Sequence, residues 1–190
     1  MIKIIGGKHK RININTLDGL NTRPTSIRIR EAMFNILLHS KYLDKKIENM
    51  EVIDIFAGSG ALGLEALSRG FKFCTFLDNS SAAINIIQKN IKKLGEEKNT
   101  SLIQSDANSP YLAKKKYDIC FFDPPYDFKN FNVLLECWSS SDAVKKNTLY
   151  VYEKHRSMPY NSIKGLDIIE RKKYGISEII ILKSLSSSTK

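Results

Sequence analysis

In its first third the chain reads Glu51-Val52-Ile53-Asp54-Ile55-Phe56-Ala57-Gly58-Ser59-Gly60-Ala61-Leu62-Gly63, an apolar run followed by a glycine-rich loop. A short apolar run bounded by turn residues predicts a buried β-strand over residues 51–56. Glycines spaced as G-x-G-x-x-G allow a tight turn, and the helix that follows offers its N–H groups to an anionic group. Alone, this pattern is a weak sign of nucleotide binding, so its surroundings decide how much it means.

Three further predicted strands follow the loop, and each leads into an aspartate. They cover residues 71–77, 100–104 and 117–122, with a helix over 82–94 between the first two. Ligands bind at the carboxyl ends of the strands in an open α/β sheet. A lone aspartate at a strand end is usually a helix cap or solvated, whereas four along one edge favour a binding site. With the first strand included, these residues are Asp54, Asp78, Asp106 and Asp123, and Asp78 has the spacing of a ribose-binding acid.

The fourth strand runs into Asp123-Pro124-Pro125-Tyr126. Each proline pushes the residue before it into an extended conformation, so Asp123 and Pro124 have little conformational freedom. The prolines have no N–H, which leaves carbonyl acceptors beside the aspartate. A stiff acceptor with a flat ring next to it suits an exocyclic amine on a planar base. The alternative is a strand-to-turn connector with a solvated aspartate, although loops at strand ends often carry function.

Length and composition favour a single globular domain. The 190 residues are 42% hydrophobic and 26% charged, which are ordinary globular values. No apolar stretch approaches the roughly 20 residues of a membrane span, and the N-terminus lacks the apolar region of a signal peptide. Cys74, Cys120 and Cys137 have neither metal-binding nor redox-motif spacing. We therefore expect reduced, mostly packed thiols in a cytoplasmic protein without a metal.

The net charge of +10 is concentrated outside the central block of the chain. Residues 1–50 carry ten basic residues against four acidic ones, residues 51–150 carry twelve of each, and residues 151–190 carry eight against four. An even spread would indicate only solubility. Basic flanks around a neutral core favour a polyanionic partner such as a nucleic acid.

The basic N-terminal region predicts a hairpin and a helix. Residues 1–5 and 12–15 form two short predicted strands joined by a basic turn, and a helix follows the breaker cluster at 21–25 and ends near Ser40. Cations at the start of a helix oppose its dipole, so the arginines there need another explanation. Contacts with phosphate or with an acidic cofactor tail would supply one, as would a pair with Glu31 or a distant carboxylate. These arginines are Arg23, Arg28 and Arg30.

The last third of the chain continues the alternation of strands and helices. A helix is predicted over residues 128–138 and a fifth strand over 149–153. A closing antiparallel hairpin is predicted from residues 166–170 and 179–182, with the basic segment 171–175 between its strands.

The chain resembles the RsmD family of bacterial 16S ribosomal RNA guanine-N2 methyltransferases over nearly its full length. The aspartate-proline-proline-aromatic motif alone is typical of amino-methyltransferases that act on DNA or RNA. The N-terminal arginine-proline segment, joined to this glycine loop, narrows the match. The matching stretches are Ile4-Ile5-Gly6-Gly7-Lys8, Thr22-Arg23-Pro24-Thr25 with Arg28, Arg30-Glu31 and Phe34-Asn35, Asp54 to Gly70, Asp123 to Tyr126, Tyr152-Glu153 and Lys173-Tyr174-Gly175.

The resemblance implies an α/β fold of the Rossmann-like, class I S-adenosylmethionine-dependent type. Such a fold has a mixed, mostly parallel seven-stranded sheet with helices on both faces, here with a small N-terminal hairpin and helix added. The resemblance divides the chain into an RNA-binding extension over residues 1–40, a methyltransferase domain over 41–184 and a polar tail over 185–190. It implies 16S ribosomal RNA as the partner, within a partly or fully assembled small subunit, and a cytoplasmic monomer.

The resemblance also implies roles for the candidate residues. Asp123 and the Pro124 carbonyl would accept hydrogen bonds from the target amine, beside Pro125, and Tyr126 would stack on the extruded base. The cofactor would be S-adenosylmethionine, with its methionine end at the glycine loop. The family usually has Glu where this chain has Asp78, which concerns cofactor affinity more than activity. Among the cofactor-binding residues, Asp78 would bind the ribose and Asp106 the adenine. The full cofactor-binding set is Asp54, Phe56, Ala57, Gly58, Ser59, Gly60, Asp78, Asn79, Asp106 and Ala107. The RNA-binding set is Lys8, Lys10, Arg11, Arg23, Arg28 and Arg30.

Three other functions fit parts of the sequence. A DNA adenine-N6 methyltransferase uses the same amine-acceptor motif but commonly has an added target-recognition domain. An NAD(P)-dependent oxidoreductase fits the glycine pattern but leaves the Asp123 motif and the basic flanks unexplained. A non-catalytic RNA-binding module would need neither cofactor affinity nor Asp123.

Overall fold

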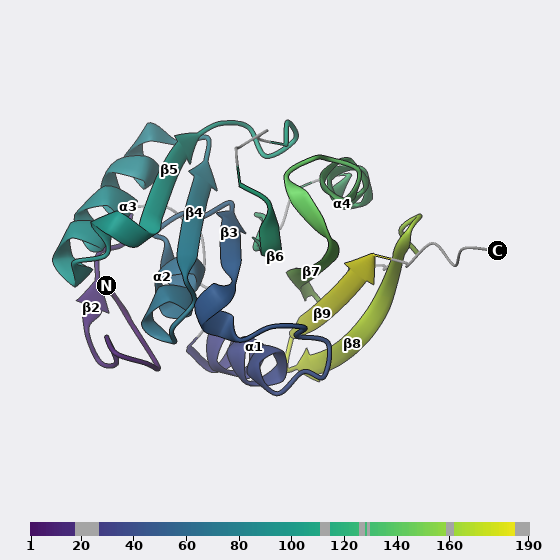
Figure 1. The fold of residues 1–190 in the computed structure, drawn as a ribbon, viewed down its shortest axis with the longest axis horizontal. Helices are drawn as coiled ribbons and strands as arrows, with labels where there is room; N and C mark the ends of the chain where they lie inside the picture. Colours follow the sequence, from purple (N-terminus) through teal and green to yellow (C-terminus); the bar gives the residue numbers. More distant parts are fainter. Residues whose placement is uncertain (18–26, 111–114, 126–127, 129, 159–161, 185–190) are drawn as a thin grey trace.

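A seven-stranded sheet forms the centre of the protein, with a two-stranded hairpin beside it (Figure 1). The computed structural model describes residues 1–17, 27–110, 115–125, 128, 130–158 and 162–184. The hairpin consists of β1 (Ile2–Lys3) and β2 (Asn13–Ile14). The sheet contains β3 (Glu51–Ile55), β4 (Phe73–Asp78), β5 (Thr100–Gln104), β6 (Tyr117–Phe122), β7 (Val144–His155), β8 (Leu166–Tyr174) and β9 (Ser177–Ser184).

The strand order β5-β4-β3-β6-β7-β9-β8 confirms the predicted mixed, mostly parallel sheet. The first five strands in this order are parallel, and β9 and β8 add an antiparallel end. The chain moves outward from β3 to β5 and then returns to place β6 on the other side of β3. In open α/β sheets such a reversal of order marks the ligand-binding crevice. We call the edge where β3 to β7 end the carboxyl edge, and the opposite one the amino edge.

Helices cover both faces of the sheet, as predicted (Figure 1). Buried residues of α1, α2 and α3 share one apolar cluster with one side of the strands, and those of α4 share a second cluster with the other side. Alternate residues of each parallel strand enter the two clusters because successive side chains point to opposite faces. The helices are α1 (Ile27–Leu38), α2 (Ala61–Ser68), α3 (Ser81–Leu94) and α4 (Phe131–Ser139), with short 3₁₀ turns η1 (Ile47–Asn49) and η2 (Glu97–Asn99).

Three predicted boundaries are wrong in the second half of the chain. Helix α4 begins at Phe131 rather than at residue 128, because Asn130 has a left-handed backbone with φ of 64°. Strand β7 begins five residues before the predicted start at 149. The basic segment 171–174 lies in strand β8 instead of in the turn, which falls at Gly175 with φ of 58°.

The N-terminal hairpin is anchored by a buried glutamate of α2. Glu65 has no exposed surface, and its two carboxylate oxygens accept the N–H groups of Ile5 and Gly6 at 2.8 Å each. Its Oε1 also accepts the Nε–H of Arg69 at 2.7 Å. At Gly7, with φ of 73°, a Cβ would lie 1.7 Å from the carbonyl oxygen of Ser68, so only glycine fits there.

The same cluster explains Arg30, which is one of the residues predicted from the sequence to contact RNA. Its side chain is fully buried, and its Nη2 donates to the Lys3 carbonyl at 2.6 Å. Burial lowers the pKa of the guanidinium, while the nearby charge of Glu65 opposes that shift. The assignment of Arg30 to RNA phosphates is therefore wrong, because its partners are the hairpin backbone and a distant carboxylate.

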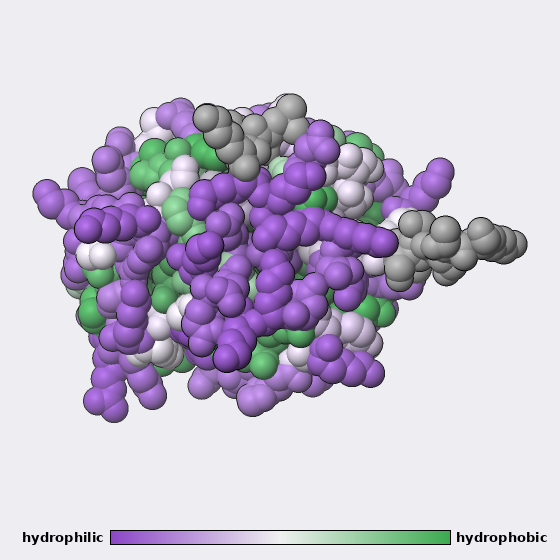
Figure 2. Space-filling model, viewed as in Figure 1, coloured by the Kyte–Doolittle hydropathy of each residue, from purple (hydrophilic) through white to green (hydrophobic). Residues whose placement is uncertain are grey.

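The surface seen in Figure 2 is mostly hydrophilic, with apolar side chains gathered in small patches. Among the described residues, the large hydrophobic side chains that are well exposed come from separate elements, such as Ile27 in α1 and Val133 in α4. No helix in the described ranges has both the length and the apolar character needed to cross a bilayer. Cys74 and Cys120 are packed in the interior, and Cys137 is exposed.

Replacing Glu65 with alanine should strongly destabilise the fold. The change leaves two backbone N–H groups and two neighbouring guanidinium groups without their carboxylate, and we expect a loss of about 3–5 kcal/mol in the free energy of unfolding. Urea denaturation would measure it. The matched control is Glu48→Ala at an exposed position, for which we expect a change within about 0.5 kcal/mol. Equal effects of the two variants would mean that the anchor contributes no stability.

Candidate active site

The four predicted aspartates lie at or near the carboxyl edge of four adjacent parallel strands. Asp54 is the last residue but one of β3, and Asp78 is the last residue of β4. Asp123 directly follows β6. Asp106 follows β5 by two residues. Burial raises the pKa of Asp54 well above its usual value, and the negative charges of Asp123 and Asp78 add to the rise. Asp54 is thus close enough to Asp78 and to Asp123 to be affected by their charges.

Asp54 holds the glycine loop onto the sheet. Its side chain is 1% exposed, and its Oδ2 accepts the N–H of Gly63 in the first turn of α2 at 2.9 Å. A Cβ on Gly63 would lie 2.3 Å from the Phe76 ring and 2.5 Å from the sulfur of Cys74. The third glycine of the pattern therefore serves close helix–strand packing, while Asp54 satisfies a helix N–H that has no partner within the helix.

Asp78 fixes the other end of the same loop. Its Oδ2 accepts the N–H of Gly58 at 2.8 Å, and its Oδ1 accepts the N–H of Ser80 at 2.9 Å. Both oxygens are thereby oriented, and each keeps a lone pair for another donor. Local backbone bonds thus account for part of what these aspartates do, which the count of acids in the sequence did not reveal.

The chain between these two anchors is bent into an unusual backbone conformation. Phe56 has φ of 64°, which is rare for an aromatic residue, and Gly58 and Gly60 have φ of 55° and 77°. A Cβ on Gly58 would meet only one atom within 4 Å, the Phe56 carbonyl oxygen at 3.9 Å. The Phe56 ring packs edge-on against Phe128 with 5.0 Å between centroids. Strained backbone of this kind clusters at functional sites, and it places an aromatic wall beside the loop.

Asn90 of α3 is a site residue that the sequence did not single out. Its fully buried side chain donates through Nδ2 to the carbonyls of Ser59 and Asn15 at 3.0 Å each, and its Oδ1 accepts the Asn15 N–H at 2.8 Å. One amide therefore joins the glycine loop, α3 and the segment after β2. An asparagine within a mostly polar helix stretch carries no signal of such a role.

The predicted adenine side of the site lies at the end of β5. Asp106 is exposed, and its Oδ1 accepts the backbone and side-chain N–H groups of Asn108 at 2.8 and 3.0 Å. The carbonyl of buried Ala107 accepts the indole N–H of Trp138 at 2.9 Å, which ties this loop to α4. The carbonyl of exposed Asn79 accepts from Gln104 at 3.4 Å.

The amine-acceptor motif begins where β6 ends. Asp123 and Pro124 are partly exposed, and the Pro125 carbonyl accepts the Phe128 N–H at 2.9 Å. Among the described residues, no backbone N–H donates a hydrogen bond to the Pro124 carbonyl. Tyr126 lies outside the described residues.

Aromatic residues on the α4 side pack beside the motif. Tyr152 of β7 stacks on Phe131 with 3.7 Å between ring centroids, and Phe131 meets Phe122 edge-on at 5.8 Å. Burial raises the pKa of Tyr152, and the charge of Asp123 adds to the rise, so the two side chains are neighbours. This group of aromatic rings could not be predicted from local sequence patterns, because its members come from three different elements.

The predicted RNA-binding residues fall into separate groups. Lys10 and Arg11 are exposed, and Lys8 pairs with Glu96 at 2.7 Å while keeping 55% of its side chain exposed. This turn packs on the C-terminal end of α2, at the amino edge and away from Asp123. Arg28 is exposed in the first turn of α1, and Arg23 lies outside the described residues.

Comparison with known proteins identifies the family. The model named Conserved hypothetical protein 95 matches residues 2–183. Ribosomal RNA small subunit methyltransferase D of Buchnera aphidicola subsp. Acyrthosiphon pisum is 35% identical over 158 residues, which cover 82% of this chain and 78% of the relative. The protein of the same name from Haemophilus influenzae is 28% identical and covers 92% of this chain and 90% of its own length.

Solved structures agree with the sequence relatives. The Escherichia coli protein yhhF superimposes with a TM-score of 0.80 and 28% identity, covering 96% of this chain and 97% of its own. A SAM-dependent methyltransferase from Aquifex aeolicus has a TM-score of 0.63 at 14% identity, over 85% of this chain and 94% of its own, and shows the fold alone. The chain belongs to the RsmD family of ribosomal RNA methyltransferases.

Proposed function

We propose that this protein transfers a methyl group from S-adenosylmethionine to the exocyclic N2 of one guanine in 16S ribosomal RNA. One observation carries the proposal. Asp123-Pro124-Pro125 follows β6, the glycine loop follows β3, and these two strands are neighbours in the sheet. A stiff acceptor for an amine then stands next to a loop built for a nucleotide-like cofactor. The ribosomal RNA relatives favour this reading over DNA adenine methylation and over hydride transfer.

The residues at the carboxyl edge fit the proposed cofactor chemically. The partly exposed acids Asp78 and Asp123, which lie near the buried Asp54, favour a cationic ligand, and S-adenosylmethionine carries a sulfonium and an ammonium group. Asp78 would accept hydrogen bonds from the ribose hydroxyls with its remaining lone pairs. The glycine loop would hold the methionine end, and Asp106 with Asn79 and Ala107 the adenine. When bound, the cofactor supplies the methyl group in electrophilic form.

The chain contributes alignment more than acid–base chemistry. The N2 lone pair of guanine is delocalised into the ring, which makes it a poor nucleophile. Hydrogen bonds from this amine to Asp123 and to the Pro124 carbonyl would favour the pyramidal geometry in which the lone pair is available. Tyr126 would stack on the extruded base. Holding two reacting groups in line supplies several orders of magnitude in rate, so a strong general base is not required.

The proposed function also includes the form of the RNA substrate, either free 16S RNA or RNA within the small subunit. A domain of 190 residues has little surface for reading a sequence, so we favour 16S RNA within a partly or fully assembled small subunit. Methyl transfer from labelled S-adenosylmethionine to small subunits, naked 16S RNA and duplex DNA, followed by nucleoside analysis, tests this. Label on guanine N2 supports the proposal, whereas label on DNA adenine or on no RNA contradicts it.

Asp123→Asn should lower the methyl-transfer rate by about 10²–10³-fold, because the amine loses a charged acceptor that acts in the transition state. The affinity for S-adenosylmethionine, measured by calorimetry, should change little. The control is Asp142→Asn at an exposed position, which should keep the full rate. A wild-type rate in Asp123→Asn would remove Asp123 from the catalytic set.

Asp78→Asn should raise the dissociation constant for S-adenosylmethionine by about 10-fold or more, since a charged acceptor is lost from the ribose and from the Gly58 N–H. Calorimetric titration measures the constant directly, and thermal unfolding without cofactor reports on damage to the loop. Asp167→Asn, on the exposed face of β8, is the matched control. Unchanged affinity in Asp78→Asn would argue that this aspartate only holds the loop.

A further inference from the structure

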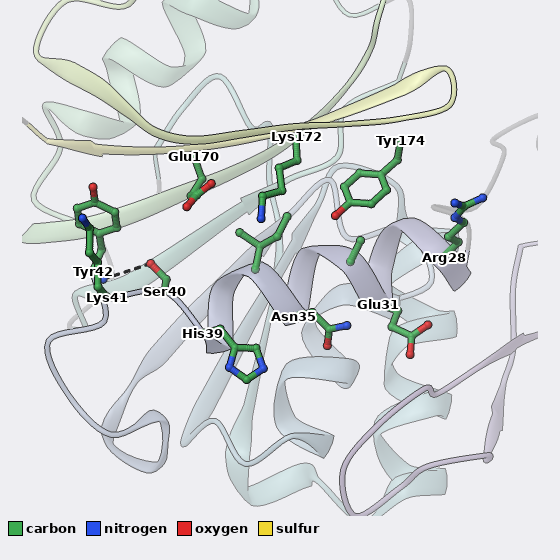
Figure 3. Close-up of a pocket in the computed structure, with 12 residues that line it drawn as sticks. Arg28, Glu31, Asn35, His39, Ser40, Lys41, Tyr42, Glu170, Lys172 and Tyr174 are labelled. Carbon is green, nitrogen blue, oxygen red and sulfur yellow. Dashed lines mark hydrogen bonds between the residues drawn. The ribbon is translucent and has the colours of Figure 1, made fainter.

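A groove of about 610 Å³ runs between α1 and the edge strand β8, apart from the glycine loop and Asp123 (Figure 3). Arg28 and Asn35 line it from α1, seven residues apart on one face of the helix, and His39 lines it directly after the helix ends. Glu170, Lys172 and Tyr174 line it from β8, where alternate residues point to the same side. One wall of the groove is thus formed by side chains on one face of the α1 segment, and the opposite wall by alternate side chains of β8.

The composition of the groove suits a polyanion with flat bases. Its cations are Arg28, Lys41 and Lys172, and the rings of Tyr42 and Tyr174 lie toward its two ends (Figure 3). Basic residues interleaved with aromatic rings are typical of surfaces that bind single-stranded nucleic acid.

Two acids share the groove with these cations. Glu31 and Glu170 reduce its positive charge, and each supplies acceptors for ribose hydroxyl or base amino groups. Outside it, Lys183 lies 6.0 Å from the Tyr42 ring, and Lys173 is exposed on β8. The groove and its rim therefore keep an excess of positive charge.

The groove leads to the edge of the sheet where Asp123 lies. Tyr174 of β8 pairs with Ser177 of β9, which in turn pairs with His155 of β7. Three residues earlier on β7, Tyr152 pairs with Phe122, the last residue of β6. Tyr174 therefore ends β8 at the carboxyl edge, three strand spacings or about 14 Å from β6. Arg28, in the first turn of α1, lies at the same end of the groove as Tyr174 (Figure 3).

We propose that this groove holds the single-stranded RNA next to the target guanine, with backbone phosphates at Arg28 and Lys172 and a base on Tyr174. The proposal rests on the methyl-transfer function above and names the surface that recognises its substrate. Helix α1 offers a groove about 16 Å long between residues 28 and 39, enough for a strand segment rather than a single phosphate.

The test measures binding of a labelled 12-nucleotide single-stranded RNA by fluorescence anisotropy at several salt concentrations. Lys172→Gln should weaken binding about 5- to 10-fold and lower the slope of log affinity against log salt by about 0.7, because one phosphate contact is lost. Tyr174→Leu should weaken binding about 10-fold with an unchanged slope, since it removes stacking and no charge. Lys164→Gln, at an exposed position before β8, is the matched charge control.

Outcomes separate this inference from the proposed function. Affinity for S-adenosylmethionine should be unchanged in every variant, and the KM for small subunits should rise in Lys172→Gln and Tyr174→Leu only. If Lys172→Gln behaves like Lys164→Gln, or if the variants lose binding to subunits but not to RNA, the groove does not hold RNA. If the wild type methylates no guanine while the groove variants still weaken RNA binding, the proposed function fails and the groove assignment stands.

Discussion

The return of the chain to place β6 beside β3 is the constraint on which the site depends. Residues 51 and 123 are far apart in sequence, yet Ile55 pairs with Phe122 across one strand spacing, about 4.8 Å. The glycine loop directly after β3 and Asp123 directly after β6 therefore lie on neighbouring strands at the same edge of the sheet. A sheet that grew in one direction would have left β4 and β5 between them. The apolar side chains that alternate between the two core clusters fix this register, because a slip by one residue would expose them to the wrong face.

The glycine loop is held by side chains from three different elements. Asp54 of β3 accepts from Gly63, Asp78 of β4 accepts from Gly58, and Asn90 of α3 donates to the Ser59 carbonyl. These bonds offset the left-handed conformation of Phe56, which costs on the order of 1–3 kcal/mol. A loop fixed in this way needs little rearrangement to hold a ligand. The same carboxylates shape the loop and give it a negative charge, so structure and recognition are served by one set of groups.

Strands buried on both faces could be predicted from the sequence, and long-range polar contacts could not. The run from Tyr117 to Phe122 is apolar throughout because β6 lies in the middle of the sheet, and its predicted ends are correct. The prediction that the segment 171–174 lies between the hairpin strands is wrong, because an edge strand can carry charges on its open side and β8 continues to Tyr174. Arg30 was misassigned because the helix-dipole rule is local, whereas its partners come from β1 and α2. Asn90 gave no signal, since its role exists only once three elements meet.

The distribution of charge has a consequence for how RNA approaches. The carboxyl edge carries the accessible acids Asp78, Asp106 and Asp123 above the buried Asp54, and accessible acids favour a cationic cofactor over a phosphate. Strand β8, which carries Lys172 of the α1–β8 groove, lies three strand spacings or about 14 Å from β6, and farther from β3, β4 and β5. This spacing exceeds the screening length of about 8 Å at physiological salt, so Lys172 does not cancel the charge of these acids. A strand held by its phosphates in the groove could then present to Asp123 only a group without a phosphate. An extruded base fulfils that condition, and its exocyclic amine is the part that an acidic acceptor attracts. Separating a basic groove from an acidic edge therefore selects a flipped base without any contact that reads sequence.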